Sequence, residues 1–229
     1  MRCIRTHTLI ALLCAALMLF TAPAASAADL FLVKFRGGVA LAVWRTCPQW
    51  QVGAVCEETV VIASDAMTFE KYPEGRERDK GPRVVLQRFV FEIVDLGEDG
   101  LSSRPIRESF GGTDEADVTI NRRSRWATAS AAAIPMNTTE YHGDESVTYE
   151  ETVSLDVEWT GQGELQRIDE RDHYNDRLQL FISYPKGWER SAVATGTIDG
   201  APIAGTLDES ATTLINVAQG ELRLYKRQQ

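Results

Sequence analysis

The stretch that decides the fold is Val147–Trp159, VTYEETVSLDVEW, in which apolar and polar residues alternate. A period of two places successive side chains on opposite faces of an extended chain, so it predicts a β-strand with one face in water. Glu151 is the single interruption of the apolar face, and we expect a bend or a β-bulge near it. The apolar face otherwise consists of Val147, Tyr149, Val153, Leu155, Val157 and Trp159.

The same pattern recurs along the chain in segments that glycine- and proline-bearing turns separate. Val84–Leu96 is apolar on both faces, as suits a central strand. About ten such segments predict an all-β fold, a single antiparallel β-sandwich over residues 28–229, with a closed lipocalin-like barrel as the alternative. The other main strands are expected at Leu30–Phe35, Val39–Trp44, Glu58–Ala63, Ala116–Trp126, Leu178–Tyr184, Arg190–Ile198, Thr212–Ala218 and Glu221–Lys226.

Three segments between these strands are interpreted differently. Arg36–Gly38 separates two apolar runs, so a hairpin turn is expected there. Lys71–Lys80 is charged and contains proline and glycine, which predicts a loop in solvent. Ala127–Ile134 is rich in alanine and is followed by Pro135. It fits a helical turn, a strand of small residues or a flexible join.

The N-terminus has the anatomy of a signal peptide over residues 1–27. Arg2 and Arg5 precede the uncharged apolar run Leu9–Phe20, and Ala25–Ala27 supplies a small-x-small cleavage site. The apolar run is about 12 residues long, whereas a membrane-spanning helix needs about 20. The sequence therefore predicts a periplasmic or secreted protein without a membrane span in the mature chain.

The net charge narrows the choice of partners, and the cysteine content predicts a disulfide. The chain has 24 basic and 33 acidic residues and a formal net charge of −9, which disfavours nucleic acid as a partner. Cys47 and Cys56 are the two cysteines outside the predicted signal peptide, and export favours a disulfide between them. We expect the bond to join a hairpin of Val39–Thr46 and Glu57–Ala63.

No motif in the sequence indicates catalysis. The chain lacks the G-x-S-x-G, H-E-x-x-H, P-loop and G-x-G-x-x-G patterns. We therefore expect a non-catalytic binding module for a protein or carbohydrate, which uses the loop aromatics Trp50 and Trp188. Trp44 and Trp159 fall within strand patterns and are expected in the core. The alternatives are a glycosidase-like hydrolase with a carboxylate pair, and a small-ligand carrier with an apolar cavity.

One polar stretch has the side chains of a possible metal site. Asp169, Asp172, His173 and Asp176 follow one another closely, and convergence with His142 and Asp144 would complete a set of ligands. Oxygen ligands in loops suit calcium, whereas an imidazole favours zinc or manganese. The spacing matches no established calcium loop, and solvated loop side chains are the simpler interpretation. The sequence indicates no other cofactor.

Overall fold

The computed structural model describes residues 30–47, 51–72, 75–79, 82–97, 100–169, 172–175, 179–183 and 186–226. These residues form sixteen strands in one antiparallel sheet, which confirms the all-β prediction. The strands are β1 (Leu30–Arg45), β2 (Val55–Ser64), β3 (Met67–Tyr72), β4 (Gly75–Asp79), β5 (Arg83–Asp95), β6 (Leu101–Thr113), β7 (Asp117–Ile120), β8 (Trp126–His142), β9 (Glu145–Gly161), β10 (Gln166–Asp169), β11 (Asp172–Asn175), β12 (Gln179–Ser183), β13 (Lys186–Ile198), β14 (Ala201–Pro202), β15 (Thr206–Leu207) and β16 (Thr213–Lys226).

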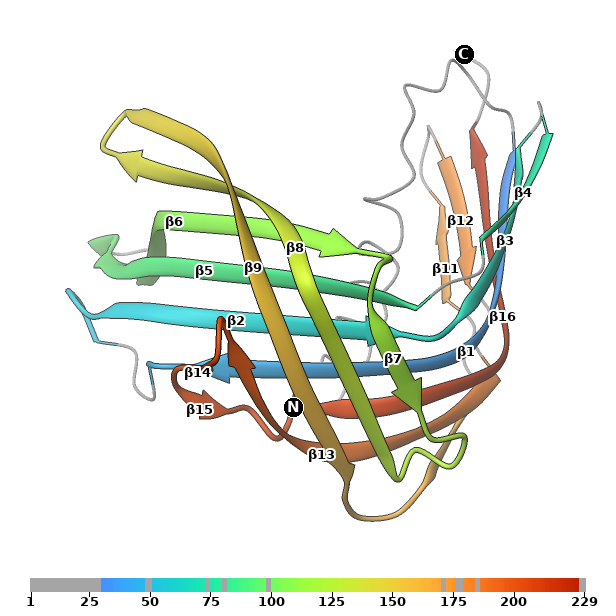
Figure 1. Cartoon of the computed structure of the whole chain (residues 1–229). Coiled ribbons are helices and arrows are strands. Elements are labelled where there is room, and N and C mark those ends of the chain that lie inside the picture. The colour runs from blue at the N-terminus through green and yellow to red at the C-terminus, as the bar shows by residue number, and fades with distance from the viewer. Residues whose placement is uncertain are drawn as a thin grey trace.

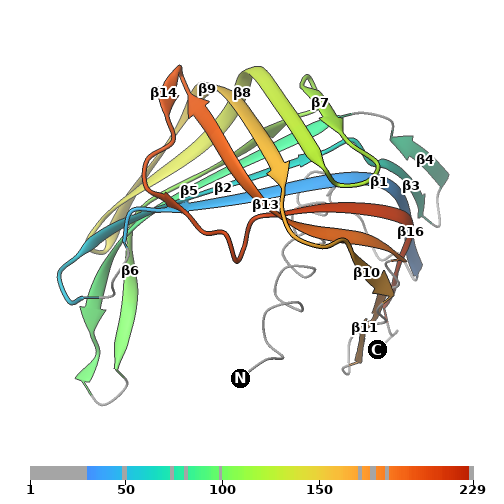
Figure 2. The ribbon, with the colours of Figure 1, turned by 90° about the horizontal axis from the view of Figure 1, so that it is seen from below.

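The sheet folds back on itself, so that two of its parts face each other. Its main strands follow the order β16-β13-β9-β8-β6-β5-β2-β1, and β1 also pairs with β16. In Figure 1, β8 and β9 cross in front of β5, β2 and β1. Seen from below, β1, β2 and β5 form an arch (Figure 2). The outline is that of a flattened sandwich, as predicted, and not of a regular barrel.

The main core lies between the two facing parts of the sheet. Trp44, Leu86, Ile134, Leu155 and Trp159 are buried in one apolar cluster that draws on both parts. Each large apolar side chain removed from water stabilises the fold by about 1.5–3 kcal/mol. Alternate residues of β8 in this cluster are alanines, and their small side chains leave room for the aromatic rings opposite. They are Ala127, Ala129 and Ala131.

A second apolar cluster lies on the opposite face of the central strands. Val39, Leu41 and Val43 of β1 belong to it, whereas the intervening residues of β1 belong to the main core. In β5, Val85 belongs to the second cluster and its neighbours Val84 and Leu86 to the main core. The prediction that Val84–Leu96 is a central strand with two apolar faces is therefore correct for this part of β5.

The hairpin turn expected at Arg36–Gly38 is wrong, because β1 runs through these residues as one strand. Its pairing with β16 shifts register between Phe35 and Gly37, and Gly37 has φ of 146°. A Cβ atom at Gly37 would collide with the backbone of Ala66. The glycine therefore permits an irregularity within a strand and a close approach of the chain, not a reversal.

Strands also occupy parts of two other segments, Lys71–Lys80 and Ala127–Ile134. Residues within Lys71–Lys80 form the end of β3 and all of β4, which pair as a hairpin, so the predicted loop is wrong there. Ala127–Ile134 belongs to β8, which continues through Pro135. The pairing of β8 with β9 shifts register between Ala131 and Ile134. The irregularity expected near Glu151 thus lies on the partner strand, a few residues away along the sheet.

The N-terminal prediction falls outside this description. Residues 1–27, interpreted above as a signal peptide, precede the first described residue, Leu30. In the described ranges, no helix has the length and apolar character needed to cross a membrane.

Candidate functional site

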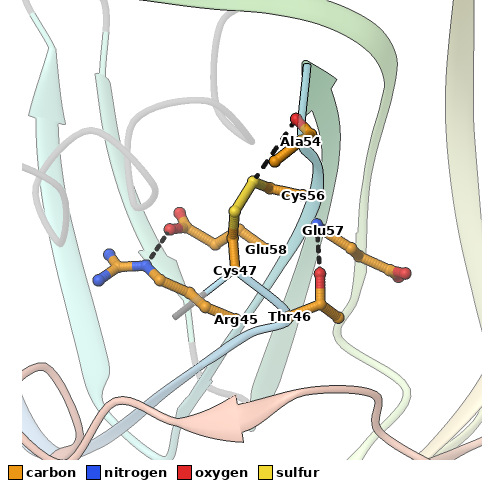
Figure 3. Close-up of a disulfide and its surroundings, with 7 residues drawn as sticks. All are labelled: Arg45, Thr46, Cys47, Ala54, Cys56, Glu57 and Glu58. Carbon is orange, nitrogen blue, oxygen red and sulfur yellow. Dashed lines mark hydrogen bonds and ion pairs between the residues drawn. A yellow bond between two sulfur atoms is a disulfide. The ribbon is translucent and has the colours of Figure 1, made fainter. Parts of the chain in front are cut away.

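The disulfide between Cys47 and Cys56 is present, as predicted (Figure 3). It joins the end of β1 to β2, and the two Cα atoms are 5.0 Å apart. Thr46 reinforces the junction, because its backbone N–H donates to the carbonyl of Glu57 at 3.0 Å and its Oγ1 accepts from the N–H of Glu57 at 2.8 Å. The predicted hairpin of β1 and β2 is therefore correct, and its loop is closed at the neck.

A cluster of ion pairs lies beside this disulfide. Arg45 Nε is 2.5 Å from Glu58 Oε2, and Arg45 Nη1 is 2.5 Å from Asp208 Oδ2. Partial burial raises the pKa of Asp208, but hydrogen bonds from Ser210 and the charge of Arg45 outweigh it and lower the pKa overall. Asp208 follows β15, so the cluster fastens the β14–β15 segment to the stapled hairpin.

A polar surface on the inward side of the sheet is the strongest candidate for a functional site. It extends the main core along the same strands, because side chains two residues apart share a face. Register places Thr59, Arg88, Ser109, Thr138 and Tyr149 in one row across five strands. We call this surface the polar inner face, and it comprises Glu57, Thr59, Arg88, Val90, Arg107, Ser109, Thr138, Glu140, Val147, Tyr149 and Glu151.

A short chain of hydrogen bonds forms the floor of the polar inner face. Thr138 Oγ1 lies 2.6 Å from Glu151 Oε1 and 2.8 Å from Ser109 Oγ. Because one hydroxyl carries one proton, Thr138 donates to the carboxylate and accepts from Ser109. Ser109 and Thr138 are both buried. Glu151, which interrupts the apolar pattern of its strand, is therefore held by a buried partner.

The two arginines of the polar inner face differ in their partners. Arg88 Nη2 donates to Glu57 Oε1 at 3.0 Å, and both side chains are about three-quarters buried. Arg107 lies between Val90 and Glu140 in the register of β5, β6 and β8. No ion pair joins Arg107 to another residue in the described ranges. Its guanidinium is a half-buried cation on an inward-facing surface.

The carboxylate of Glu140 has two side-chain partners, Tyr149 of this face and His142 near the end of β8. Tyr149 Oη donates to Glu140 Oε1 at 3.0 Å, and His142 Nε2 lies 3.8 Å from Glu140 Oε2. The hydrogen bond to Glu140 is the main reason that the pKa of Tyr149 is raised, because it stabilises the protonated phenol. Tyr149 is 40% exposed, and Val147, two residues away on the same face, is 57% exposed. The face thus offers an oriented carboxylate and an accessible aromatic ring.

Of the predicted binding aromatics, Trp50 lies outside the described residues. Trp188 is 43% exposed, but it lies in β13 and not in a turn, with Asn216 and Arg167 as its neighbours in register. Trp188 is not part of the polar inner face. Trp44 and Trp159 are buried, as expected, with 4% and 1% exposed.

The possible metal ligands are only partly described. Asp169 ends β10, where Arg167 Nη2 lies 3.0 Å from its Oδ2. Asp172 and His173 belong to β11, and Asp176 lies outside the described residues. The turn between β8 and β9 and the strand β11 lie toward opposite sides of the molecule in Figure 1. The part of the chain that is described holds no cluster of three or more potential metal-ligand side chains.

The sequence-based analysis missed the polar inner face as a site. One signal pointed to it, because Glu151 is a charged residue at an otherwise apolar position of its strand. The other charges could not be assigned to the same surface without the pairing of β2, β5, β6 and β8. Comparison of the chain with protein-family models, curated proteins and solved structures finds no match.

Proposed function

We propose that this protein is exported and acts by binding, without a reaction of its own, and that the polar inner face is its binding surface. The signal-peptide anatomy of residues 1–27 and the cysteine pair support export. The absence of a recognisable catalytic motif in the sequence favours binding over catalysis.

The observation that carries this proposal is that Arg107, unlike Arg88, has no ion-pair partner in the described ranges. A charge on an inward face lowers stability unless it is paired, and Arg88 on the same face has such a partner in Glu57. Arg107 has no ion pair in the described ranges, and its positive charge acts against the rise in the pKa of Tyr149, a residue that is 40% exposed. An unpaired cation, an oriented carboxylate and an exposed aromatic ring on one concave side of a sheet are the elements of a polar ligand site.

The two tryptophans predicted as binding residues from the sequence take a secondary place in this proposal. Trp188 is exposed on β13 but is not part of the polar inner face. Trp50 lies between Cys47 and Cys56 in the sequence, and a disulfide across a binding loop reduces the entropy cost of binding. Both rings are proposed as further contacts for a large ligand, and Tyr149 as the central one.

A second candidate is a hydrolase that uses a carboxylate pair. Glu140 and Glu151 lie on one face, and the negative charges of both contribute to the raised pKa of Tyr149 between them. Release of reducing ends from a polysaccharide, abolished by Glu140→Gln or Glu151→Gln, would support hydrolysis. The cavity lined by Arg83, Val84, Gly112, Thr113 and Asp114 measures about 190 Å³, below the usual range for ligand pockets of about 300–1,000 Å³. This cavity therefore gives no support to an apolar carrier.

Stability measurements test the binding role without knowledge of the ligand. Arg107→Leu should leave the free energy of unfolding within about 0.5 kcal/mol of the wild type or raise it, because a binding residue contributes little to folding. Arg88→Leu is the matched control, and it should lower that free energy by about 1–3 kcal/mol because Glu57 loses its partner. Urea unfolding measures both. A loss for Arg107→Leu as large as for Arg88→Leu would make Arg107 a structural residue.

Export has its own test. Mass spectrometry of the protein recovered from the periplasm or medium should find an N-terminus near Ala28. A folded protein that keeps Met1 would contradict the proposal of export.

A further inference from the structure

We propose that the ligand of the polar inner face is a neutral carbohydrate, whose hydroxyls are held by Glu140 and Arg107 and whose apolar ring face packs on Tyr149. This inference rests on the proposed binding function and adds the class of ligand. It follows from the balance of charge on the face, the orientation of Glu140 and the exposure of Tyr149.

The charges of the polar inner face are nearly balanced. Arg88 and Glu57 neutralise each other in their ion pair. Arg107 lies opposite Glu140 in the register of β6 and β8, whereas Glu151 lies on β9. Together these three side chains leave a formal excess of one negative charge on the face. At about 4 Å, two like charges repel by about 1 kcal/mol in water and about 4 kcal/mol near a protein surface. An anionic ligand would meet the carboxylates and a cationic ligand would meet Arg107, whereas a neutral ligand avoids both costs.

The hydrogen-bonding groups suit a ligand with many hydroxyls. A carboxylate accepts at about four lone-pair positions, and Tyr149 and His142 account for part of those at Glu140. Arg107 supplies several N–H donors in a fixed plane. Vicinal hydroxyls both donate and accept, so one pair of them can bond to the carboxylate and the guanidinium at once. The register places Arg107 and Glu140 directly opposite each other on β6 and β8.

Tyr149 supplies the apolar part of the site. Its hydroxyl donates to Glu140 Oε1 at 3.0 Å, and the residue is 40% exposed. An aromatic ring with a tethered polar end presents apolar area at a small entropy cost. Val147, 57% exposed, extends the same apolar strip along β9. Neighbouring strands lie about 4.8 Å apart, so β6, β8 and β9 span about 10 Å, enough for a short oligosaccharide.

A matched pair of tyrosines allows a sharp test. Tyr141 Oη donates to Glu108 Oε2 at 2.9 Å and has a raised pKa from that bond, as Tyr149 has from its bond to Glu140. Tyr141 and Glu108 fall on the opposite side of the sheet, one residue out of phase with the polar inner face. Isothermal titration calorimetry of the exported protein would use cellotriose, maltotriose and chitotriose as neutral probes. Trigalacturonate and tetralysine would be the charged probes.

The expected result is that at least one neutral trisaccharide binds and that neither charged probe binds as well. Glu140→Gln and Tyr149→Ala should each weaken that binding by about tenfold or more. Tyr141→Phe, the control, should change it by less than about twofold.

Three other results would overturn the inference. Tighter binding of trigalacturonate or tetralysine, lost in Tyr149→Ala, would reject a neutral sugar but leave the binding function at this face. Binding of none of the five probes would also reject the carbohydrate, and the stability of Arg107→Leu would still decide the proposed function. Sugar binding that Glu140→Gln and Tyr149→Ala leave unchanged would place the site elsewhere and reject both proposals.

Discussion

The two halves of the β8–β9 hairpin have the same alternation of apolar and polar residues, but the apolar side chains of β9 are buried in one half and exposed in the other. In one half, Val153, Leu155, Val157 and Trp159 are at most 5% exposed and pack in the main core. In the other half, Val147 and Tyr149 continue the same face and are 57% and 40% exposed. The hairpin is one continuous ladder from Trp126–Thr160 to His142–Glu145, apart from a single register shift.

The difference teaches that alternation identifies the face of a strand but not whether that face is covered. The buried half lies across β1, β2 and β5, whose apolar residues complete the core. The exposed half extends toward the turn at Gly143, where the inward positions of its neighbours are polar. On β9 the buried apolar side chains end at Val153, and the polar inner face begins at Glu151.

The largest expected effect comes from the buried half. Trp159→Ala should destabilise the protein by about 3–5 kcal/mol, because it leaves a cavity among close-packed side chains. Tyr149→Ala, ten residues earlier on the same face, should leave the unfolding midpoint nearly unchanged. Thermal and urea unfolding of both variants would compare the two halves directly. Similar losses for the two would show that they form a single core.

A smaller effect is expected at the β1–β2 hairpin, which is closed by a disulfide where the β8–β9 hairpin is not. Replacing Cys47 and Cys56 together by serine should lower the free energy of unfolding by about 2–4 kcal/mol, because the closed loop restricts the unfolded chain. Urea unfolding with and without reductant measures this. The double variant should be insensitive to reductant, and an equal response of variant and wild type would contradict a structural role for the bond.

Loss of a buried hydroxyl at the boundary between the two halves should have an intermediate effect on the free energy of unfolding. Thr138→Val keeps the shape of a buried residue but removes the hydroxyl that bonds to Glu151 and Ser109. The free energy of unfolding should fall by about 1–3 kcal/mol, because both groups lose a partner away from water. Thr148→Val on the outer side of β9 is the control and should have little effect. Equal stability of Thr138→Val and wild type would mean that water replaces the hydroxyl.

The smallest expected effect concerns the titration of the Tyr149 phenol in the exposed half. The hydrogen bond to Glu140 raises the pKa of Tyr149, so this residue's contribution to stability is present below its unfolded pKa and is lost as pH rises through the folded value. Ultraviolet absorbance should show Tyr149 ionising above the usual range for tyrosine. Glu140→Gln should bring that titration back down, whereas an unchanged titration would mean that the bond does not persist in solution.

Much of the local structure could be predicted from the sequence. Alternation in Val147–Trp159 identified β9, and the pair of cysteines identified the stapled hairpin. Errors arose where one residue pattern has two physical uses. Glycines at Arg36–Gly38 suggested a turn, but a glycine also permits an irregular strand that passes close to Ala66. For Ala127–Ile134 the strand, one of three interpretations, is correct, and β8 continues through Pro135 close to a register shift.

The sequence alone determined that the chain is built of antiparallel strands, where most of them lie, and which cysteines are joined. These follow from side-chain alternation and short-range chemistry, which act within a few residues. Only the tertiary structure decided that Arg107 of β6, Glu140 of β8 and Tyr149 of β9 share one surface. Strand order and register depend on which long-range pairs bury the most apolar area together. A single strand carries no record of its neighbours, so a site assembled across several of them emerges only when the sheet has formed.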